Sequence, residues 1–186
     1  MPQGSTVHPT QGIGVAVPGF HLRLINGGTV SLQMLLEGRQ GAAIVFWSGI
    51  CSHCAHYDRY LNVFAACHPE LGFVTIASRK GETPDTLLAI AAARELTFPI
   101  LYDPESAVAE QWFTRQTPRV FLVDSLGRLI YRGAIDNYRY PDDLEYVGYL
   151  EPAIAQFLSG TSVSRSETAS FGCAIQSVYY NLPKAL

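Results

Sequence analysis

The chain has 186 residues, of which 48% are hydrophobic and 16% are charged, and its formal net charge is −3. A domain of this size can bury a core without disulfide staples, and four cysteines are too few for a disulfide scaffold. The chain lacks a lysine- or arginine-rich run, which argues against a nucleic-acid partner. No apolar run approaches the ~20 residues of a membrane span. We therefore expect one globular domain that binds no nucleic acid and contains no membrane span.

The first 19 residues predict a loose lead-in. They are rich in proline, glycine, threonine and glutamine, and they lack the basic and apolar regions of a secretory signal peptide. We predict three parts in the chain: a lead-in over 1–19, a folded domain over 20–160 and a polar tail over 161–186.

Predicted strands and helices alternate along the chain. In order, they are a hairpin over 20–32, a short helix over 32–37, a strand over 42–47, a helix over 51–66, a strand over 73–78, a helix over 85–96, a short strand or connector over 98–103, a short helix over 106–113, strands over 119–124 and 128–133, and a helix over 144–158. Ser31 and Thr83 are placed to cap two of the helices, and Pro84 occupies a first helical position. Crossovers imply parallel strands in the first half, and the short connection after 124 implies a hairpin. The predicted fold is α/β, with a mixed central sheet and helices on both faces.

The motif FWSGICSHC, residues 46–54, places two cysteines where a helix follows a buried strand. The free N–H groups and partial positive charge of a helix N-terminus favour a thiolate at Cys51. Cys54 lies within one helical turn, so the two sulfurs can form and break a disulfide with little backbone motion. We interpret the pair as a redox centre.

Other interpretations of the two cysteines fit less well. A zinc site that also used Cys67 or His68 would need a further ligand, and the following stretch offers only Glu70. Haem attachment requires histidine directly after the second cysteine, where Ala55 stands. Two inert buried cysteines remain an alternative. We predict no metal and no cofactor.

Residues 20–158 resemble the redoxin branch of the thioredoxin superfamily, which comprises TlpA-like thiol–disulfide oxidoreductases and relatives of alkyl hydroperoxide reductase/thiol-specific antioxidant. The motif at 46–54, with Trp47 four residues before the first cysteine, is similar to its active site. The first hairpin and residues 98–136 are similar to further parts of that branch. The segment FGCAIQ, residues 171–176, resembles a Gly-Cys-x-Ile-Lys ending of some peroxiredoxin-like members.

The resemblance implies a thioredoxin-like fold and a role for each site residue. Cys51 would attack a disulfide and Cys54 would resolve the intermediate. Thr117-Pro118 matches the cis-proline position, where the Thr117 backbone would pair with an extended substrate segment. Arg119 follows this proline, and its side chain would act on the thiolate charge, contact a substrate or lie at the surface. Trp47 would pack near the site.

The resemblance also implies the partners and the compartment. Protein thiols or disulfides and a redox partner protein are the expected partners. An extracytoplasmic, periplasmic location is expected from the family, although this chain shows no signal peptide. Val45 replaces the buried acid of thioredoxin, so proton transfer from Cys54 would use water, His56 or Asp58.

His53 lies between the two cysteines and is expected to tune their chemistry. An imidazole that donates to the Cys51 thiolate stabilises the reduced form and makes the pair more oxidising. We predict a reduction potential above that of thioredoxin, which is about −270 mV. A solvent-facing His53 without effect is the alternative.

A thiol peroxidase is the main alternative function. Peroxiredoxins hold their cysteine in a P-x-x-x-T-x-x-C pattern and lower its pKa with an arginine. Here Ile44 and Ser48 stand at the proline and threonine positions, and Pro118 stands at the arginine position. A non-catalytic thioredoxin-fold module is a third option.

The remaining two cysteines carry separate expectations. Cys67 ends the helix that begins at the motif, and we predict a small core residue there. Cys173 is either a further redox cysteine or a structural one that pins the tail. A Cys67–Cys173 disulfide is one form of the structural option.

Overall fold

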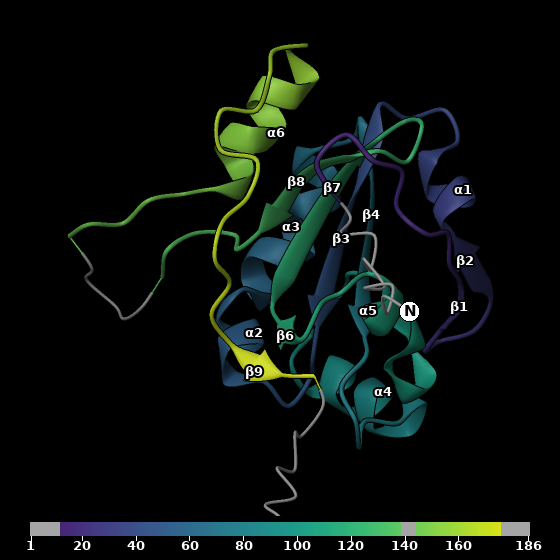
Figure 1. Ribbon diagram of the computed structural model, residues 1–186. Helices are drawn as coiled ribbons and strands as arrows, with labels where there is room; N and C mark the ends of the chain where they lie inside the picture. Colours follow the sequence, from purple (N-terminus) through teal and green to yellow (C-terminus); the bar gives the residue numbers. More distant parts are fainter. Residues whose placement is uncertain (1–11, 139–143, 176–186) are drawn as a thin grey trace, which may run out of the picture.

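The computed structural model describes residues 12–138 and 144–175, and within them a seven-stranded sheet carries helices on both faces (Figure 1). The strands of this sheet are β1 His21–Leu24, β2 Thr29–Ser31, β3 Gly41–Trp47, β4 Leu71–Ala77, β5 Ile100–Tyr102, β7 Arg119–Asp124 and β8 Leu129–Gly133. The helices are α1 Leu32–Leu36, α2 Ser52–His56, α3 Asp58–Cys67, α4 Pro84–Ala93, the 3₁₀ turn η1 Pro104–Ser106, α5 Ala107–Gln111 and α6 Leu150–Leu158. Two short strands, β6 Gln116–Thr117 and β9 Cys173–Ala174, pair separately.

The central sheet is mixed, as predicted. Its strand order is β2-β1-β5-β4-β3-β7-β8. The β3-β4 and β4-β5 pairs are parallel, whereas β7 runs antiparallel to both β3 and β8. The parallel pairs follow from crossover connections through helices, and the β7-β8 pair follows from a tight hairpin. The predicted α/β fold is confirmed.

Alternate residues of β3 enter two separate cores, which explains its continuous apolar sequence. Val45 and Trp47 pack with residues of α3, α4 and α6 on one face of the sheet. Ile44 and Phe46 pack with residues of α1 and α5 on the other face. All seven residues of β3 are buried, so the strand is held from both sides along its whole length. A rigid strand therefore leads directly into the cysteine motif.

Two of the predicted helix caps are present. The Ser31 side chain accepts a hydrogen bond from the Met34 amide at 3.2 Å. Thr83 and Thr86 form a reciprocal capping box, and Pro84 occupies the first turn of α4. Capping satisfies amides that lack an intrahelical partner, which is why these residue types mark helix starts correctly.

The helix predicted over 51–66 is instead two helices that meet at Tyr57. The backbone of this residue leaves the helical region at φ −95° and ψ 0°, and its amide bonds to the carbonyls of Cys54 and Ala55. The Tyr57 hydroxyl donates to buried Asp136, while the neighbouring Asp58 bonds to another element. Long-range side-chain contacts therefore override a local pattern that contains no proline or glycine.

The helix predicted over 144–158 begins only at Leu150. Pro152 lies in its first turn, where its missing N–H costs no intrahelical hydrogen bond. A helix that began at 144 would place this proline in its interior, where its ring would clash with a preceding carbonyl. Part of the segment before α6, residues 139–143, lies outside the described residues.

The stretch predicted as a loose lead-in is partly attached to the sheet. The Gly14 and Val17 amides donate to the carbonyls of Leu129 and Gly127 at 2.7 and 2.9 Å, and Val17 is buried. Residues 1–11 lie outside the described residues. None of the helices in the described ranges is long and apolar enough to cross a membrane.

The β7-β8 hairpin offers a matched test of core packing. Leu122 in β7 is fully buried, whereas Leu126 in the turn is 71% exposed. We expect Leu122→Ala to lower the free energy of unfolding by about 2–5 kcal/mol, because it leaves a cavity, and Leu126→Ala to change it by less than about 0.5 kcal/mol. Urea denaturation followed by circular dichroism measures both. Equal losses in the two variants would contradict this assignment of the core.

Candidate active site

The candidate site lies at the carboxyl end of β3, where two segments distant in sequence meet. A loop over 48–50 leads from Trp47 to Cys51, which precedes the first residue of α2. The second segment precedes β7, and its Thr117-Pro118 peptide bond is cis. Because β3 and β7 are antiparallel neighbours, the last residues of β3 and the first residues of β7 lie at the same end of the sheet.

Cys51 is held as a buried, acidic thiol. It is 1% exposed, and its Sγ lies 3.4 Å from the Thr117 carbonyl oxygen, to which the thiol donates when it is protonated. The hydrogen bond with the Cys54 side chain lowers the pKa of Cys51 to about 4, against the opposing effect of burial. Hydrogen bonds with Cys173, the Cys54 amide and the Thr117 side chain act in the same lowering direction. Cys51 is therefore the more acidic thiol of the motif.

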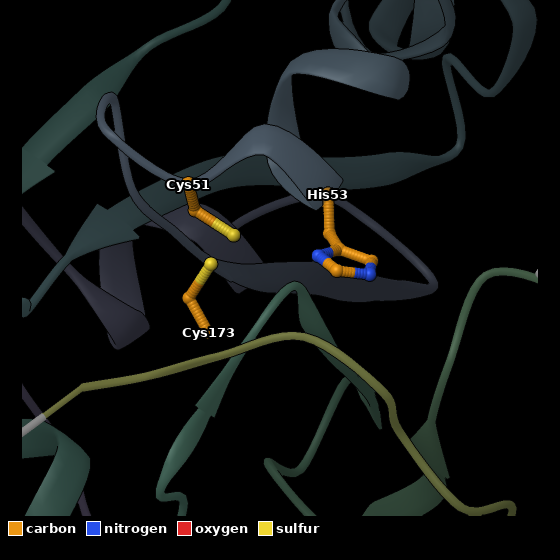
Figure 2. A group of neighbouring side chains, drawn as sticks. All are labelled: Cys51, His53 and Cys173. Carbon is orange, nitrogen blue, oxygen red and sulfur yellow. The ribbon is translucent and has the colours of Figure 1, made fainter.

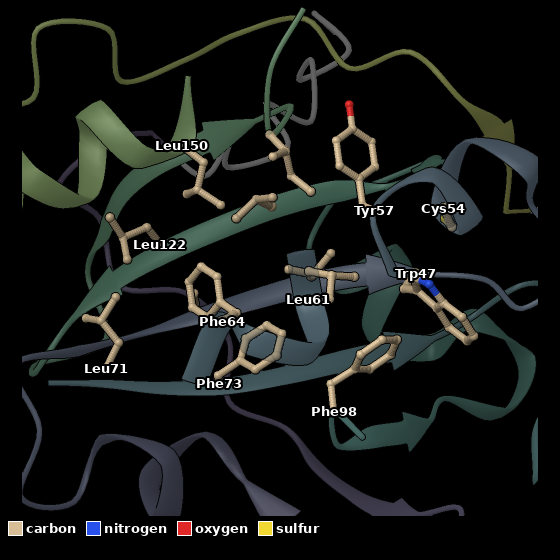
Figure 3. Packing of buried hydrophobic residues seen from close by; sticks show 14 of the residues in the cluster. Trp47, Cys54, Tyr57, Leu61, Phe64, Leu71, Phe73, Phe98, Leu122 and Leu150 are labelled. Carbon is tan, nitrogen blue, oxygen red and sulfur yellow. The ribbon is translucent and has the colours of Figure 1, made fainter. Parts of the chain in front are cut away.

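Cys54 has the opposite character. Its side chain is fully buried in the core that also contains Trp47 and Leu61 (Figure 3). Burial is the main cause that raises the pKa of Cys54 well above its usual range, and the hydrogen bond and charge of Cys51 raise it further. Both cysteines are free thiols in this structure. An acidic first thiol beside a sheltered, protonated second thiol is an arrangement that disulfide exchange can use.

Trp47 anchors the base of the site through three contacts. Its indole N–H donates to an Asp58 carboxylate oxygen at 3.3 Å, and its ring packs edge-on to Phe98 at 5.5 Å between centroids. The Arg94 guanidinium lies 5.5 Å from the same ring and also forms an ion pair with Asp58. The Asp58 carboxylate is therefore engaged by Trp47 and Arg94.

Glu82 is a buried acid at the site that sequence reasoning missed. It follows β4 and is 5% exposed. The Ser48 hydroxyl and the Ile50 amide donate to its Oε1 at 3.1 and 3.3 Å, and burial raises its pKa. Its position after β4 could have indicated this in the sequence. Because β4 runs parallel to β3, a residue just after β4 lies at the same end of the sheet as Cys51.

His53 and Arg119 lie in different surroundings. His53 is exposed on α2, and a ring nitrogen and the sulfurs of Cys51 and Cys173 all lie within 4.8 Å of one another (Figure 2). Arg119 is directed elsewhere: its guanidinium carbon lies 5.8 Å from the centre of the Phe121 ring. Phe121 belongs to the core on the opposite face from Cys51. The Arg119 guanidinium thus lies near the Phe121 ring.

Cys173 reaches the site from the end of the described chain. β9 pairs antiparallel with β6, and Cys173 stands opposite Thr117 in the register. Figure 2 shows the side chains of Cys51 and Cys173 pointing toward one another. Cys67, in contrast, is an exposed free thiol at the end of α3, so the prediction of a core residue was wrong. Cys67 and Cys173 are not joined by a disulfide.

Cys51, His53 and Cys173 are also of the types that ligate soft metals. Among the described residues, they are the group whose ligand atoms approach one another closely enough to share an ion. A closed structural zinc site requires four such ligands, and His53 is exposed.

Comparison with known proteins places these features in a family. The AhpC/TSA family model matches residues 13–132. A curated relative, the thiol–disulfide oxidoreductase ResA of Geobacillus thermodenitrificans, is 27% identical over 118 residues, which are 63% of this chain and 66% of the relative. The chain thus spans just under two thirds of that relative's length.

Solved structures share the fold. An uncharacterised conserved protein from Geobacillus kaustophilus has a TM-score of 0.80 at 24% identity, over 91% of this chain and 94% of that one. The thioredoxin domain of a thiol–disulfide oxidoreductase from Bacteroides vulgatus has a TM-score of 0.56 at 19% identity, over 70% and 91% of the two chains. These similarities confirm a thioredoxin-like fold.

The low pKa of Cys51 can be measured directly. A free cysteine titrates near pH 8.5, whereas we expect the reduced protein to gain thiolate absorbance at 240 nm with a midpoint of about 4. Cys54→Ala should move this midpoint upward, because it removes the largest stabilising contact. Cys67→Ser serves as the control and should leave the midpoint unchanged. Because the reduced protein carries other thiols, the contradicting result would be the absence of any transition near pH 4.

Proposed function

The chain belongs to the AhpC/TSA family, and from this membership and the contrast between its two motif cysteines we propose that it is a thiol–disulfide oxidoreductase. The family alone includes both disulfide exchange and peroxide reduction as expected chemistries. The observation that carries the proposal is the pair itself: Cys51 has a lowered pKa, and Cys54, one turn away, has a raised one. The name of the ResA relatives supports the same activity.

The proposed reaction is an exchange through a mixed disulfide. The Cys51 thiolate attacks one sulfur of a protein disulfide, forms a Cys51–substrate bond and releases the other substrate sulfur as a thiolate. Cys54 then loses its proton and attacks Cys51, which releases the second substrate thiolate. The substrate gains two electrons and the Cys51–Cys54 pair loses two. The reverse sequence would oxidise a protein dithiol.

The proton of Cys54 must leave before the second attack. Because the pKa of Cys54 is raised, a nearby base would assist this step. Val45 offers no acid, and Asp58 is paired with Arg94. Glu82 is buried against the loop that carries Cys51, with a raised pKa of its own. We propose Glu82 as the candidate proton carrier in place of Asp58, because Ser48 links the two groups: its backbone bonds to the Cys54 thiol, and its hydroxyl donates to Glu82.

Insulin reduction tests the proposed activity. With dithiothreitol as the electron donor, we expect the wild-type protein to accelerate insulin precipitation and Cys51→Ser to abolish the acceleration, because no other motif thiol is acidic. Cys67→Ser should retain the wild-type rate, since this thiol is exposed at the far end of α3. Rapid consumption of hydrogen peroxide by Cys51 without insulin reduction would instead assign a peroxidase. A wild-type protein that neither reduces insulin nor consumes hydrogen peroxide would leave the non-catalytic module, and full insulin reduction by Cys51→Ser would contradict the assigned role of Cys51.

The effect of His53 on the redox equilibrium is separately measurable. We expect His53→Ala to lower the reduction potential of the pair by about 30 mV, because loss of the imidazole destabilises the Cys51 thiolate in the reduced form. Equilibration with glutathione buffers measures the potential. His56→Ala is the matched control, because its ring stacks on Tyr138 at 3.7 Å. Equal potentials for the wild type and His53→Ala would contradict a role for His53.

A further inference from the structure

The C-terminal strand β9 occupies the place beside the cis-proline where an extended substrate would pair. Its pairing with β6 sets Cys173 opposite Thr117 and Ala174 opposite Gln116. Addition of a peptide strand to an exposed edge is a common mode of peptide recognition. In this protein β9 of the same chain already pairs with β6, the strand just before Pro118. Its residue nearest Cys51 is Cys173 (Figures 1 and 2).

Gly172 is the residue that permits this approach. A Cβ at this position would lie 1.9 Å from the Thr117 carbonyl oxygen and 3.2 Å from Cδ of Pro118. Real Cβ atoms do not approach backbone this closely, so any other residue would push β9 away from the site. The Gly-Cys sequence therefore fits the Thr117-Pro118 segment sterically as well as through backbone pairing.

The chain is anchored upstream of Cys173 on the outer strand of the sheet. The Arg132 amide donates to the Ser166 carbonyl at 2.9 Å, and the Thr168 amide donates to the Arg132 carbonyl at 3.1 Å. The Ala134 amide donates to the Thr168 hydroxyl at 2.9 Å, and an Arg132–Glu167 ion pair covers these bonds. Residues 166–168 thus run along β8 before the chain reaches the site.

Downstream of Cys173, Ile175 forms a second anchor. It is 2% exposed and packs into the core that α1 and α5 cover. Its amide donates to the Arg115 carbonyl at 2.9 Å, and its carbonyl accepts from the Lys80 amide at 3.1 Å. Because both flanks are fixed, Cys173 is held beside Cys51.

We propose that Cys173 is an internal substrate cysteine, which forms a disulfide with Cys51 and so guards the site until an external protein displaces β9. This inference rests on the proposed exchange activity of Cys51 and extends it to a third thiol. The observations that carry it are the approach of the two sulfurs to within 4.8 Å, the strand pairing and the steric requirement for Gly172.

The exchange is balanced within the chain. The Cys173 thiolate attacks Sγ of Cys51 in the Cys51–Cys54 disulfide. The Cys51–Cys173 bond forms, the Cys51–Cys54 bond breaks, and Cys54 leaves as a thiolate that takes up the proton released by Cys173. One disulfide and one thiol are present before and after, so this step needs no external oxidant.

Glutathione capture on the full chain tests the inference. Cys54→Ser, reduced and then treated with oxidised glutathione, first acquires glutathione on Cys51. We expect Cys173 to displace it and form the Cys51–Cys173 disulfide, whereas Cys54→Ser/Cys173→Ser should retain glutathione. The lifetime of the adduct should be shorter by about tenfold or more in the single variant, because the attack is intramolecular. Acid quenching, alkylation and peptide mass spectrometry identify each bond, and a Cys67→Ser background removes the remaining thiol.

A steric variant separates strand placement from sulfur chemistry. In the Cys54→Ser background, Gly172→Ala should lengthen the adduct lifetime toward that of the double variant, because the added Cβ meets the Thr117 carbonyl. Gly19→Ala is the matched control, since its Cβ would meet no atom within 4 Å, and it should behave as the parent. Equal adduct lifetimes with and without Cys173 would overturn the inference.

The proposed function can fail independently of this inference. Cys173→Ser keeps both motif cysteines and should form the Cys51–Cys54 disulfide on oxidation. If it forms that disulfide while Cys54→Ser forms no Cys51–Cys173 bond, only the internal-substrate role is wrong. If Cys173→Ser forms no motif disulfide, the exchange function itself is wrong.

Discussion

The backbone carbonyl of Thr117 is the point at which the parts of the site meet. Sγ of Cys51 lies 3.4 Å from it, and the absence of a side chain at Gly172 leaves room for it. Its residue also precedes the cis bond from which β7 starts. A carbonyl oxygen has two lone pairs and a fixed direction, so its position restricts both the attacking sulfur and the strand that approaches it.

The sheet fixes this carbonyl relative to Cys51. β3 and β7 are paired over six registered residue pairs, from Gly41–Asp124 to Phe46–Arg119. The motif thus leaves the end of β3 beside the start of β7. Both strands are packed by cores on their two faces. A site supported by paired, doubly buried strands is better defined than one supported by loops alone.

Local sequence patterns predicted most of the fold, because strand runs, capping residues and turn signals act over a few residues. Ser31 and Thr83 are examples, since each caps a helix through an amide three positions away. The motif also singled out Cys51 and Cys54 as candidates, because disulfide exchange depends on a short spacing between two thiols. The break at Tyr57 was not predicted; Tyr57 bonds there to Asp136, a residue far along the chain that a local pattern does not contain.

Long-range placement likewise explains what sequence reasoning missed in the site. Glu82 approaches the motif because β4 is parallel to β3 and adjacent to it; crossovers predicted parallel strands, but which strands are neighbours is not visible in a local pattern. Cys173 was recognised as a candidate thiol, but its partner was undetermined, because loop closure can bring a distant cysteine to many places. The register with Thr117 resolves that choice in favour of the neighbourhood of Cys51.

The burial of Ile175 means that the tail is a structural part of the domain. A polypeptide ended at Gly160, where the composition changes, would lose an apolar side chain from the core beneath α1 and α5. It would also leave the outer edge of β8 without the backbone partners at residues 166 and 168. Such a fragment would lack the strand that covers Cys51, but it would also lose part of the core. The reactivity of its thiols would therefore differ from that of the intact domain for both reasons.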